Sequence, residues 1–71
     1  MIKLTKLNGG EIYINAELIE TIETTPDTVI TLTTGKKYVV LDKAQDVVQL
    51  VIEYRKKVFS NILNADLVKE R

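Results

Sequence analysis

The chain has 71 residues, ten basic and ten acidic side chains that give a formal net charge of zero, and neither cysteine nor histidine. This composition excludes disulfides, thiolate or imidazole zinc sites, cysteine nucleophiles and histidine acid–base chemistry. Nucleic-acid binding is disfavoured, because it normally requires a basic surplus. A domain this short hides only about 60% of its unfolded surface, so we expect it to be reinforced by forming a homo-oligomer.

The chain shows no pattern for export or membrane insertion. Its first ten residues, MIKLTKLNGG, lack a long apolar core followed by a small-residue cleavage site. No apolar run reaches the ~18 residues that would span a bilayer. We therefore expect a cytoplasmic protein without membrane insertion.

The first expected element is a β-hairpin. MIKLTKL alternates apolar and polar residues, Asn8 and Gly9 favour a tight turn, and EIYI follows as the returning strand. Two registers are compatible with this hairpin. A two-residue Asn8-Gly9 turn would group the apolar residues of EIYI with Leu7. A three-residue loop would instead put four apolar residues on one face: Ile2, Leu4, Ile12 and Ile14.

Two further strands follow, separated by turn signals. Asn15 is suited to open a short turn through AEL, because its side-chain oxygen can accept a backbone N–H. A third strand is predicted over residues 19–24. Pro26 and Asp27 then predict a turn. The fourth strand is TVITLT.

The stretch TGKK invites comparison with a phosphate-binding loop. That motif needs a glycine five positions before Gly35 and a serine or threonine after Lys36, but Ile30 and Lys37 occupy these places. We interpret Gly35 as the positive-φ residue of a hairpin with the two-residue loop Thr34-Gly35. TGKK is therefore predicted to be a turn.

This two-residue loop fixes the faces of the predicted sheet. The core face would carry Ile30, Leu32, Val39 and Leu41. The opposite face would carry Val29, Thr31, Tyr38 and Val40. So much apolar surface is unusual for a solvated face. Either the sheet curls and covers these residues itself, or they form a subunit or partner interface.

A C-terminal helix is predicted from Lys43, with Asp42 as its cap and Gln45 closing a capping box. Its apolar residues form two stripes. The first stripe is Val47, Val51, Tyr54, Val58 and Ile62, and the second is Val48, Ile52, Phe59 and Leu63. We expect most of this band to pack on the sheet and its outer edge, near Val48, Ile52 and Phe59, to meet another chain. The basic run YRKK is interpreted as a solvated face.

No arrangement of side chains for catalysis can be named. The acidic residues are scattered along the chain, and no nucleophile–base pair or ligand set is present. We therefore expect a protein that is not an enzyme, without catalytic residues, cofactor or metal.

Four stretches together resemble the small flagellar FlbD family, which includes SwrD-like swarming motility proteins. These stretches are MIKLTKLNG, LIETIE, PDTVITLTTGKKYVV and DVVQLVIEYRKK. The resemblance runs from Met1 to about Val58. It implies a cytoplasmic, non-enzymatic accessory protein of bacterial flagellar motility that supports motor power and swarming. Thr34 departs from the asparagine that the family often has before the turn glycine.

The sequence thus predicts an α+β fold: a small antiparallel sheet of about five short strands in meander order, followed by one C-terminal helix. We expect an FlbD-like domain over residues 1–63 and a tail over 64–71 that is helical or begins a second short helix. The expected partners are further copies of the chain and flagellar motor or assembly proteins.

Two other functions remain open. A small β-rich RNA-binding regulator would need a converging basic surface, made by Lys3, Lys6, Lys36, Lys37 and Arg55. A purely structural flagellar subunit would be retained in stoichiometric amounts in isolated basal bodies.

Overall fold

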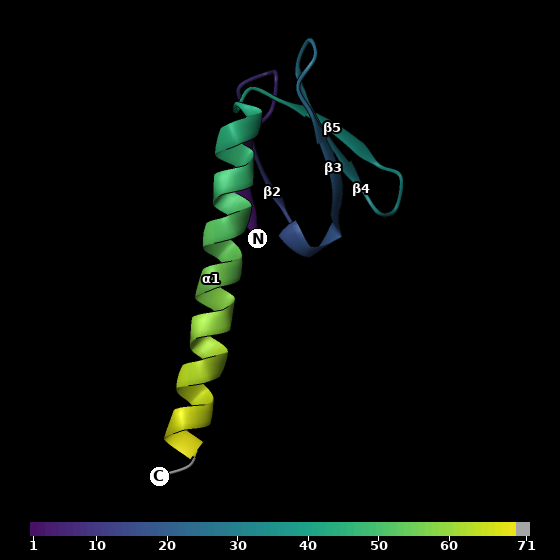
Figure 1. Cartoon of the computed structure of the whole chain (residues 1–71). Coiled ribbons are helices and arrows are strands. Elements are labelled where there is room, and N and C mark those ends of the chain that lie inside the picture. Colours follow the sequence, from purple (N-terminus) through teal and green to yellow (C-terminus); the bar gives the residue numbers. More distant parts are fainter. Residues whose placement is uncertain (70–71) are drawn as a thin grey trace.

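The computed structural model describes the backbone of residues 1–69 and the side chains of residues 1–63 (Figure 1). Its strands are β1 (Ile2–Thr5), β2 (Glu11–Ile14), β3 (Ile19–Glu23), β4 (Thr28–Leu32) and β5 (Lys37–Val40). The 3₁₀ turn η1 (Ala16–Leu18) joins β2 to β3, and the helix α1 (Ala44–Lys69) follows β5. The predicted α+β class is confirmed. The five antiparallel strands form two sheets, β1-β2 and β3-β4-β5.

The first hairpin adopts the three-residue loop. The Lys6 N–H donates to the Gly10 carbonyl at 2.7 Å, and the Gly9 N–H donates to the Lys6 carbonyl at 2.9 Å. Gly9 has a φ of 89°, which favours glycine. Ile2 therefore lies opposite Ile14, and the apolar residues of both strands share one face.

The second hairpin is built in the same way, and here the predicted register was wrong by one residue. The Leu32 N–H donates to the Lys36 carbonyl at 2.8 Å, and the Gly35 N–H donates to the Leu32 carbonyl at 2.8 Å. The loop is therefore residues 33–35, not the pair Thr34-Gly35. Gly35 has a φ of 90° at the third loop position, where a three-residue hairpin accommodates glycine. Its presence is compatible with both loop lengths, so it could not decide between them.

The left-handed backbone at Gly35 predicts a local cost for any side chain there. A Cβ at this position would meet no atom within 4 Å, so the cost comes from φ alone. We expect Gly35→Ala to lower the free energy of unfolding by about 1–2 kcal/mol, measured by urea denaturation. Gly35→Asn should cost less, because asparagine tolerates this conformation better. Equal stability of Gly35→Ala and the wild type would contradict this account.

The other predicted turns lie where the sequence indicated. The Asn15 side chain caps η1 by accepting the Glu17 N–H at 3.0 Å. Pro26 and Asp27 lie in the connection between β3 and β4. Asn8 supports the first loop, because its side-chain oxygen accepts the Gly10 N–H at 2.8 Å.

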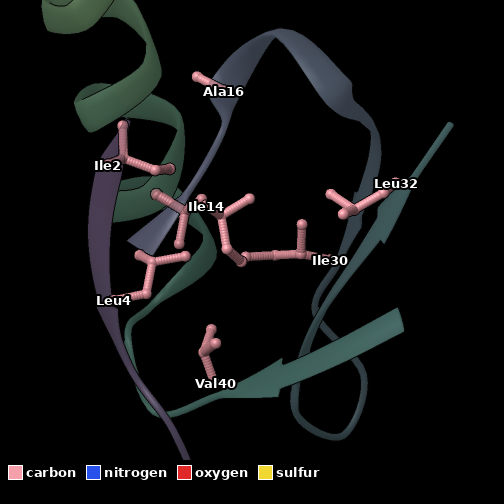
Figure 2. Packing of buried hydrophobic residues seen from close by; sticks show 8 residues of the cluster. Ile2, Leu4, Ile14, Ala16, Ile30, Leu32 and Val40 are labelled. Carbon is pink, nitrogen blue, oxygen red and sulfur yellow. The ribbon is translucent and has the colours of Figure 1, made fainter. Parts of the chain in front are cut away.

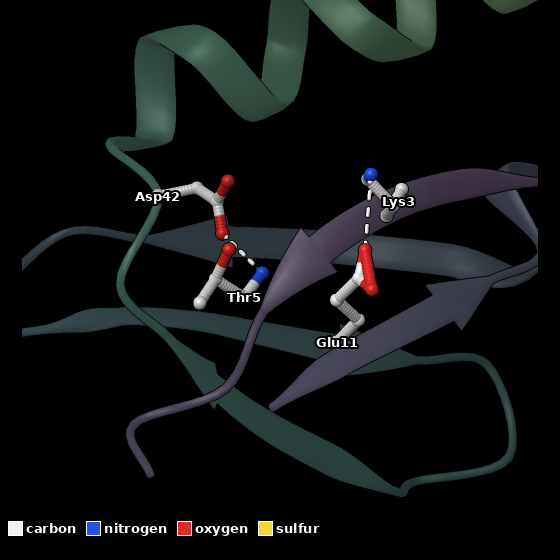
Figure 3. Close-up of polar contacts among 4 residues, drawn as sticks. All are labelled: Lys3, Thr5, Glu11 and Asp42. Carbon is white, nitrogen blue, oxygen red and sulfur yellow. Dashed lines mark hydrogen bonds and ion pairs between the residues drawn. The ribbon is translucent and has the colours of Figure 1, made fainter. Parts of the chain in front are cut away.

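The two sheets meet at Thr5. Thr5 lies opposite Glu11 next to the hydrogen-bonded pair of Lys6 and Gly10, so its own backbone groups point away from β2. The Thr5 carbonyl accepts the Leu41 N–H at 2.8 Å, and the Thr5 N–H donates to Asp42 Oδ1 at 2.7 Å (Figure 3). The spatial order of strands is therefore β2-β1-β5-β4-β3, with β1 and β5 joined at one end.

The role predicted for Asp42 was wrong. Its carboxylate binds the strand edge at Thr5 instead of capping α1, and the helix begins at Ala44. The Lys43 carbonyl accepts the Asp46 N–H at 2.9 Å and the Val47 N–H at 3.0 Å, so the hydrogen bonds of the helix start at Lys43. The unpaired N–H of Thr5 competes for the carboxylate, and the sequence gives no sign of this distant donor.

This junction predicts a difference between two substitutions of Asp42. Asp42→Ala leaves the Thr5 N–H without its partner, and we expect a loss of about 1–3 kcal/mol in the free energy of unfolding. Asp42→Asn keeps an acceptor oxygen, so its loss should be clearly smaller. Urea denaturation followed by circular dichroism measures both. Equal losses would show that the hydrogen bond does not stabilise the junction.

The core lies between the two sheets and is closed by the first turns of α1. In Figure 2, Ile2, Leu4 and Ile14 of the hairpin point toward Ile30 and Val40 of the other sheet. The core also takes in three residues around these: Ala16, Leu32 and Val47. Leu4, Ile30 and Val47 are each exposed by 1% or less. These side chains are therefore shielded from solvent, although the core is small.

A matched pair of leucines tests the position of this core. Leu4 is buried, whereas Leu7 in the first loop is 55% exposed. We expect Leu4→Ala to cost about 2–5 kcal/mol, enough to unfold much of so small a domain. Leu7→Ala should change stability by about 0.5 kcal/mol or less. Similar losses for the two variants in thermal denaturation would contradict the observed packing.

Helix α1 is much longer than the strands that it covers. It has 26 residues, which corresponds to about 39 Å, and it packs against β1 with its N-terminal half. Figure 1 shows its C-terminal half extending past both sheets, and the molecule measures 51 × 23 × 18 Å. The helix continues without a break through residues 64–69. The remainder of the predicted tail, residues 70–71, lies outside the described residues.

Candidate functional site

The candidate functional site is an exposed apolar stripe on α1, which we call the outer stripe and define as Val48, Ile52, Phe59 and Leu63. These side chains are between 40% and 62% exposed, with Phe59 the most exposed. At 100° per residue they lie on one side of the helix, turned by about 130° from the buried Val47. Val48, Ile52 and Phe59, the helix residues predicted to meet another chain, therefore share a free surface.

The first apolar stripe of α1, which runs from Val47 to Ile62, is covered only near the N-terminus of the helix. Val47 is buried, and Val51 and Tyr54 are half-buried against the core. One turn farther along, Val58 is 36% exposed, and Ile62 is 54% exposed. Neither sheet reaches this part of the helix, and Tyr54 is the last helix residue that packs against the core. Both stripes of α1 are therefore uncovered in its projecting half.

The observed register places the four residues of the predicted contact face on two different faces of the sheet. Val29 and Thr31 lie half-buried on the outer face, as expected. Tyr38 pairs with the buried Ile30 and packs against the core, and Val40 is only 2% exposed within the core. The prediction that Tyr38 and Val40 lie on the outer face was therefore wrong, because a one-residue shift moves alternate side chains to the other face.

The sequence interpretation missed the residues that replace them. Val39 pairs with Val29 and is half-buried, and Leu41, expected in the core, is 57% exposed. Both three-residue loops end in a glycine with positive φ: Gly9 ends the loop of residues 7–9, and Gly35 ends the loop of residues 33–35. Reading the second loop by analogy with the three-residue option for the first would have placed Val39 correctly.

Three exposed basic residues lie close to an acidic or aromatic side chain. Lys3 Nζ lies 3.0 Å from the Glu11 carboxylate (Figure 3), and this hydrogen bond raises the pKa of Lys3. The Arg55 guanidinium lies 3.5 Å from the Glu17 carboxylate. Lys36 Nζ lies 5.9 Å from the centre of the Tyr38 ring. Two of the five residues required for an RNA surface are therefore neutralised by nearby acids.

A shallow groove runs between the start of β1 and α1. It has a volume of about 500 Å³, and its walls combine Met1, Leu50 and Tyr54 with charged side chains such as Glu53 and Lys57. Within the described side chains, no group of three potential metal-ligating His, Cys, Asp or Glu residues occurs. Over the same part of the chain, α1 falls short of the apolar length required to cross a bilayer.

Comparison with known proteins gives one match. A family model described as "FlbD: Flagellar and Swarming motility proteins" matches residues 1–59. This range contains all five strands and the helix as far as Phe59. Searches of curated proteins and of solved structures return no match.

Proposed function

This chain belongs to the FlbD family of flagellar and swarming motility proteins, and from this premise we propose that it is a SwrD-like, non-enzymatic accessory protein acting in the cytoplasm. It supports the power of the flagellar motor through protein–protein contacts. The observation that carries the contact role is the outer stripe, which exposes large apolar side chains on the side of α1 that faces away from the buried Val47.

The chemistry of the described surface supports protein contacts over RNA binding. An RNA regulator depends on a surplus of cations, whereas this chain has a formal net charge of zero. Lys3 and Arg55 are each paired with a carboxylate. In contrast, exposed aromatic and aliphatic residues such as Phe59 and Ile52 are typical anchors of protein interfaces.

The contact role predicts a motility defect from a single charge on the outer stripe. In a motile bacterium that carries this gene, deletion should reduce swarming, and the wild-type gene should restore it. Phe59→Glu should fail to restore swarming, because a charge in a desolvated contact is strongly unfavourable. Ser60→Glu is the matched control, since it adds the same charge one residue away, where the helix is exposed and polar. Swarm expansion measures all four strains.

Crosslinking and pull-down from the same cells identify the partner. Recovery of stator, rotor or export components with the wild type and Ser60→Glu, but not with Phe59→Glu, supports the proposal. Full swarming of the deletion strain contradicts it. Stoichiometric retention in isolated basal bodies would instead indicate a structural subunit, and retardation of cellular RNA at low salt would indicate the RNA regulator.

A further inference from the structure

Two apolar stripes of α1 are uncovered where the helix projects past the sheets (Figure 1). The outer stripe is at least 40% exposed at every position, and Val58 and Ile62 of the first stripe are 36% and 54% exposed. A helix in a protein is stabilised mainly by packing of its apolar face, because propensity alone gives marginal stability. No described side chain buries these residues, so a surface that buries them must come from another molecule.

The spacing of the outer stripe is the same in both directions along the helix. Its members lie four, seven and four residues apart: Val48, Ile52, Phe59 and Leu63. The midpoint falls between residues 55 and 56. If a second helix lies antiparallel and the two midpoints coincide, Ile52 of one copy lies opposite Phe59 of the other. Val48 likewise lies opposite Leu63. Each apolar residue of the stripe therefore meets another, and all four are described by the structure.

We propose that α1 binds α1 of a second copy of this chain through the outer stripe, antiparallel, with the twofold axis between Arg55 and Lys56. This inference rests on the proposed function, which assigns protein contacts to the outer stripe, and it names a second copy as the occupant. The contact uses the same patch on both chains, as a closed twofold interface requires.

The same arrangement provides a surface for the first stripe. At 100° per residue, the outer stripe is turned by about 130° from Val47, which points into the core, and Val58 and Ile62 lie about 20° and 60° from Val47 toward the outer stripe. The twofold axis places both sheet bodies on the same side of the helix pair and at opposite ends. The sheets of the second copy therefore lie alongside the projecting half of the first helix, on the side to which Val58 and Ile62 point.

A parallel pair does not cover the first stripe. With the helices parallel and in register, both sheet bodies lie at the same end, and the projecting halves contact only each other. Val58, turned by about 110° from the outer stripe, then keeps its exposure. Parallel helices also bring like ends of their macrodipoles together, whereas antiparallel helices bring opposite ends together. The antiparallel pair is therefore favoured.

The charged residues at the axis lie beside the apolar contact. Arg55 and Lys56 are turned by about 50° to either side of the outer stripe. The Arg55 guanidinium lies 3.5 Å from the Glu17 carboxylate on η1, so each copy brings its own counter-charge to the axis. Lys56 is exposed on the other edge, where salt screens charges over about 8 Å. The formal net charge of zero gives no overall repulsion between two copies.

The described apolar surface is large enough for a reversible pair. Six side chains take part, namely the four of the outer stripe together with Val58 and Ile62. At about half exposure they present on the order of 500 Å² on each chain, so pairing removes on the order of 1,000 Å² from water. Weak specific contacts have this size. We therefore expect a dimer in equilibrium with the single chain.

Light scattering at increasing concentration tests self-association. The mass should rise toward about 16 kDa, twice the 8.1 kDa of one chain, as the concentration reaches hundreds of micromolar. Phe59→Glu should keep the mass of one chain, because a charge in the apolar contact is strongly unfavourable. Ser60→Glu is the matched control and should pair like the wild type, since it adds the same charge about 90° from the outer stripe. A wild-type mass of one chain throughout would overturn the proposal.

Single cysteines test the orientation, because the chain has no cysteine of its own. Packed helices lie about 8–10 Å apart, which brings facing Cα atoms within the roughly 7 Å that a disulfide requires. Mixed under mild oxidation, Ile52→Cys and Phe59→Cys should link to each other, because these positions face each other in the antiparallel pair. Neither variant should link to its own copy, because the two equivalent residues lie about 10 Å apart along the helix axis.

A parallel pair predicts the opposite result. Each cysteine variant alone would then form a disulfide-linked dimer, and this outcome would overturn the antiparallel arrangement. Absence of any link in the mixture, at a concentration where the wild type is paired, would overturn the contact between the stripes. Neither cysteine variant adds a charge, so this test does not depend on the folding of Phe59→Glu, which circular dichroism checks.

Failure of this inference can be told apart from failure of the proposed function. A wild type that remains a single chain, yet restores swarming and recovers motor components, removes the dimer and keeps the function. A dimer whose gene can be deleted without effect on swarming removes the function and keeps the dimer. A single chain that cosediments with phosphatidylglycerol vesicles, and loses this binding in Phe59→Glu, would replace the second copy with a membrane surface and overturn the proposal.

Discussion

The structure depends on one junction, the pair of hydrogen bonds that the backbone of Thr5 makes with Leu41 and Asp42. An isolated two-stranded hairpin is marginally stable at best, and here β1-β2 is stabilised by sharing one core with β3-β4-β5. The bonds at Thr5 hold β1 beside the end of β5, so that the apolar faces of the two sheets turn toward each other. They also fix the point from which the chain enters α1, because Asp42 lies two residues before the helix.

The position of α1 follows from this entry point. Val47, in the first turn, completes the core, and Val51 and Tyr54 continue along its edge. A core of this size is closed by about three helical turns, yet the helix has 26 residues. Its length therefore exceeds what the fold of one chain uses. The uncovered apolar surface on the projecting half of α1 results from this mismatch between a small core and a long helix, and Phe59, the most exposed residue of the outer stripe, is the last residue of the family match.

Alternation of polarity, glycine placement and helical spacing were sufficient to predict the order and type of elements. They also separated the buried and exposed stripes at Val47 and Val48, because these neighbours point to different sides of a helix. They did not fix the second hairpin register, since Gly35 supplies a positive φ in either loop length. The observed register differs from the predicted one by one residue, and this shift places Tyr38 and Val40 on the core side and Val39 on the outer face. The partner of Asp42 was equally inaccessible, because its donor lies 37 residues earlier in the chain.

Local patterns of residues were sufficient to predict the α+β class, the residues around which the chain turns and the resemblance to flagellar motility proteins. The sequence also excluded chemistry that needs cysteine or histidine. Three features became known from the three-dimensional structure alone: the division into two sheets, the register at β5 and the uncovered half of α1 (Figure 1). The division into sheets depends on contacts between residues distant in the chain, such as Thr5 and Asp42, and the uncovered half of α1 depends on how far the sheets extend along the helix (Figure 1). The register at β5 depends on which face of the strand packs into the core, and the local pattern is compatible with either loop length.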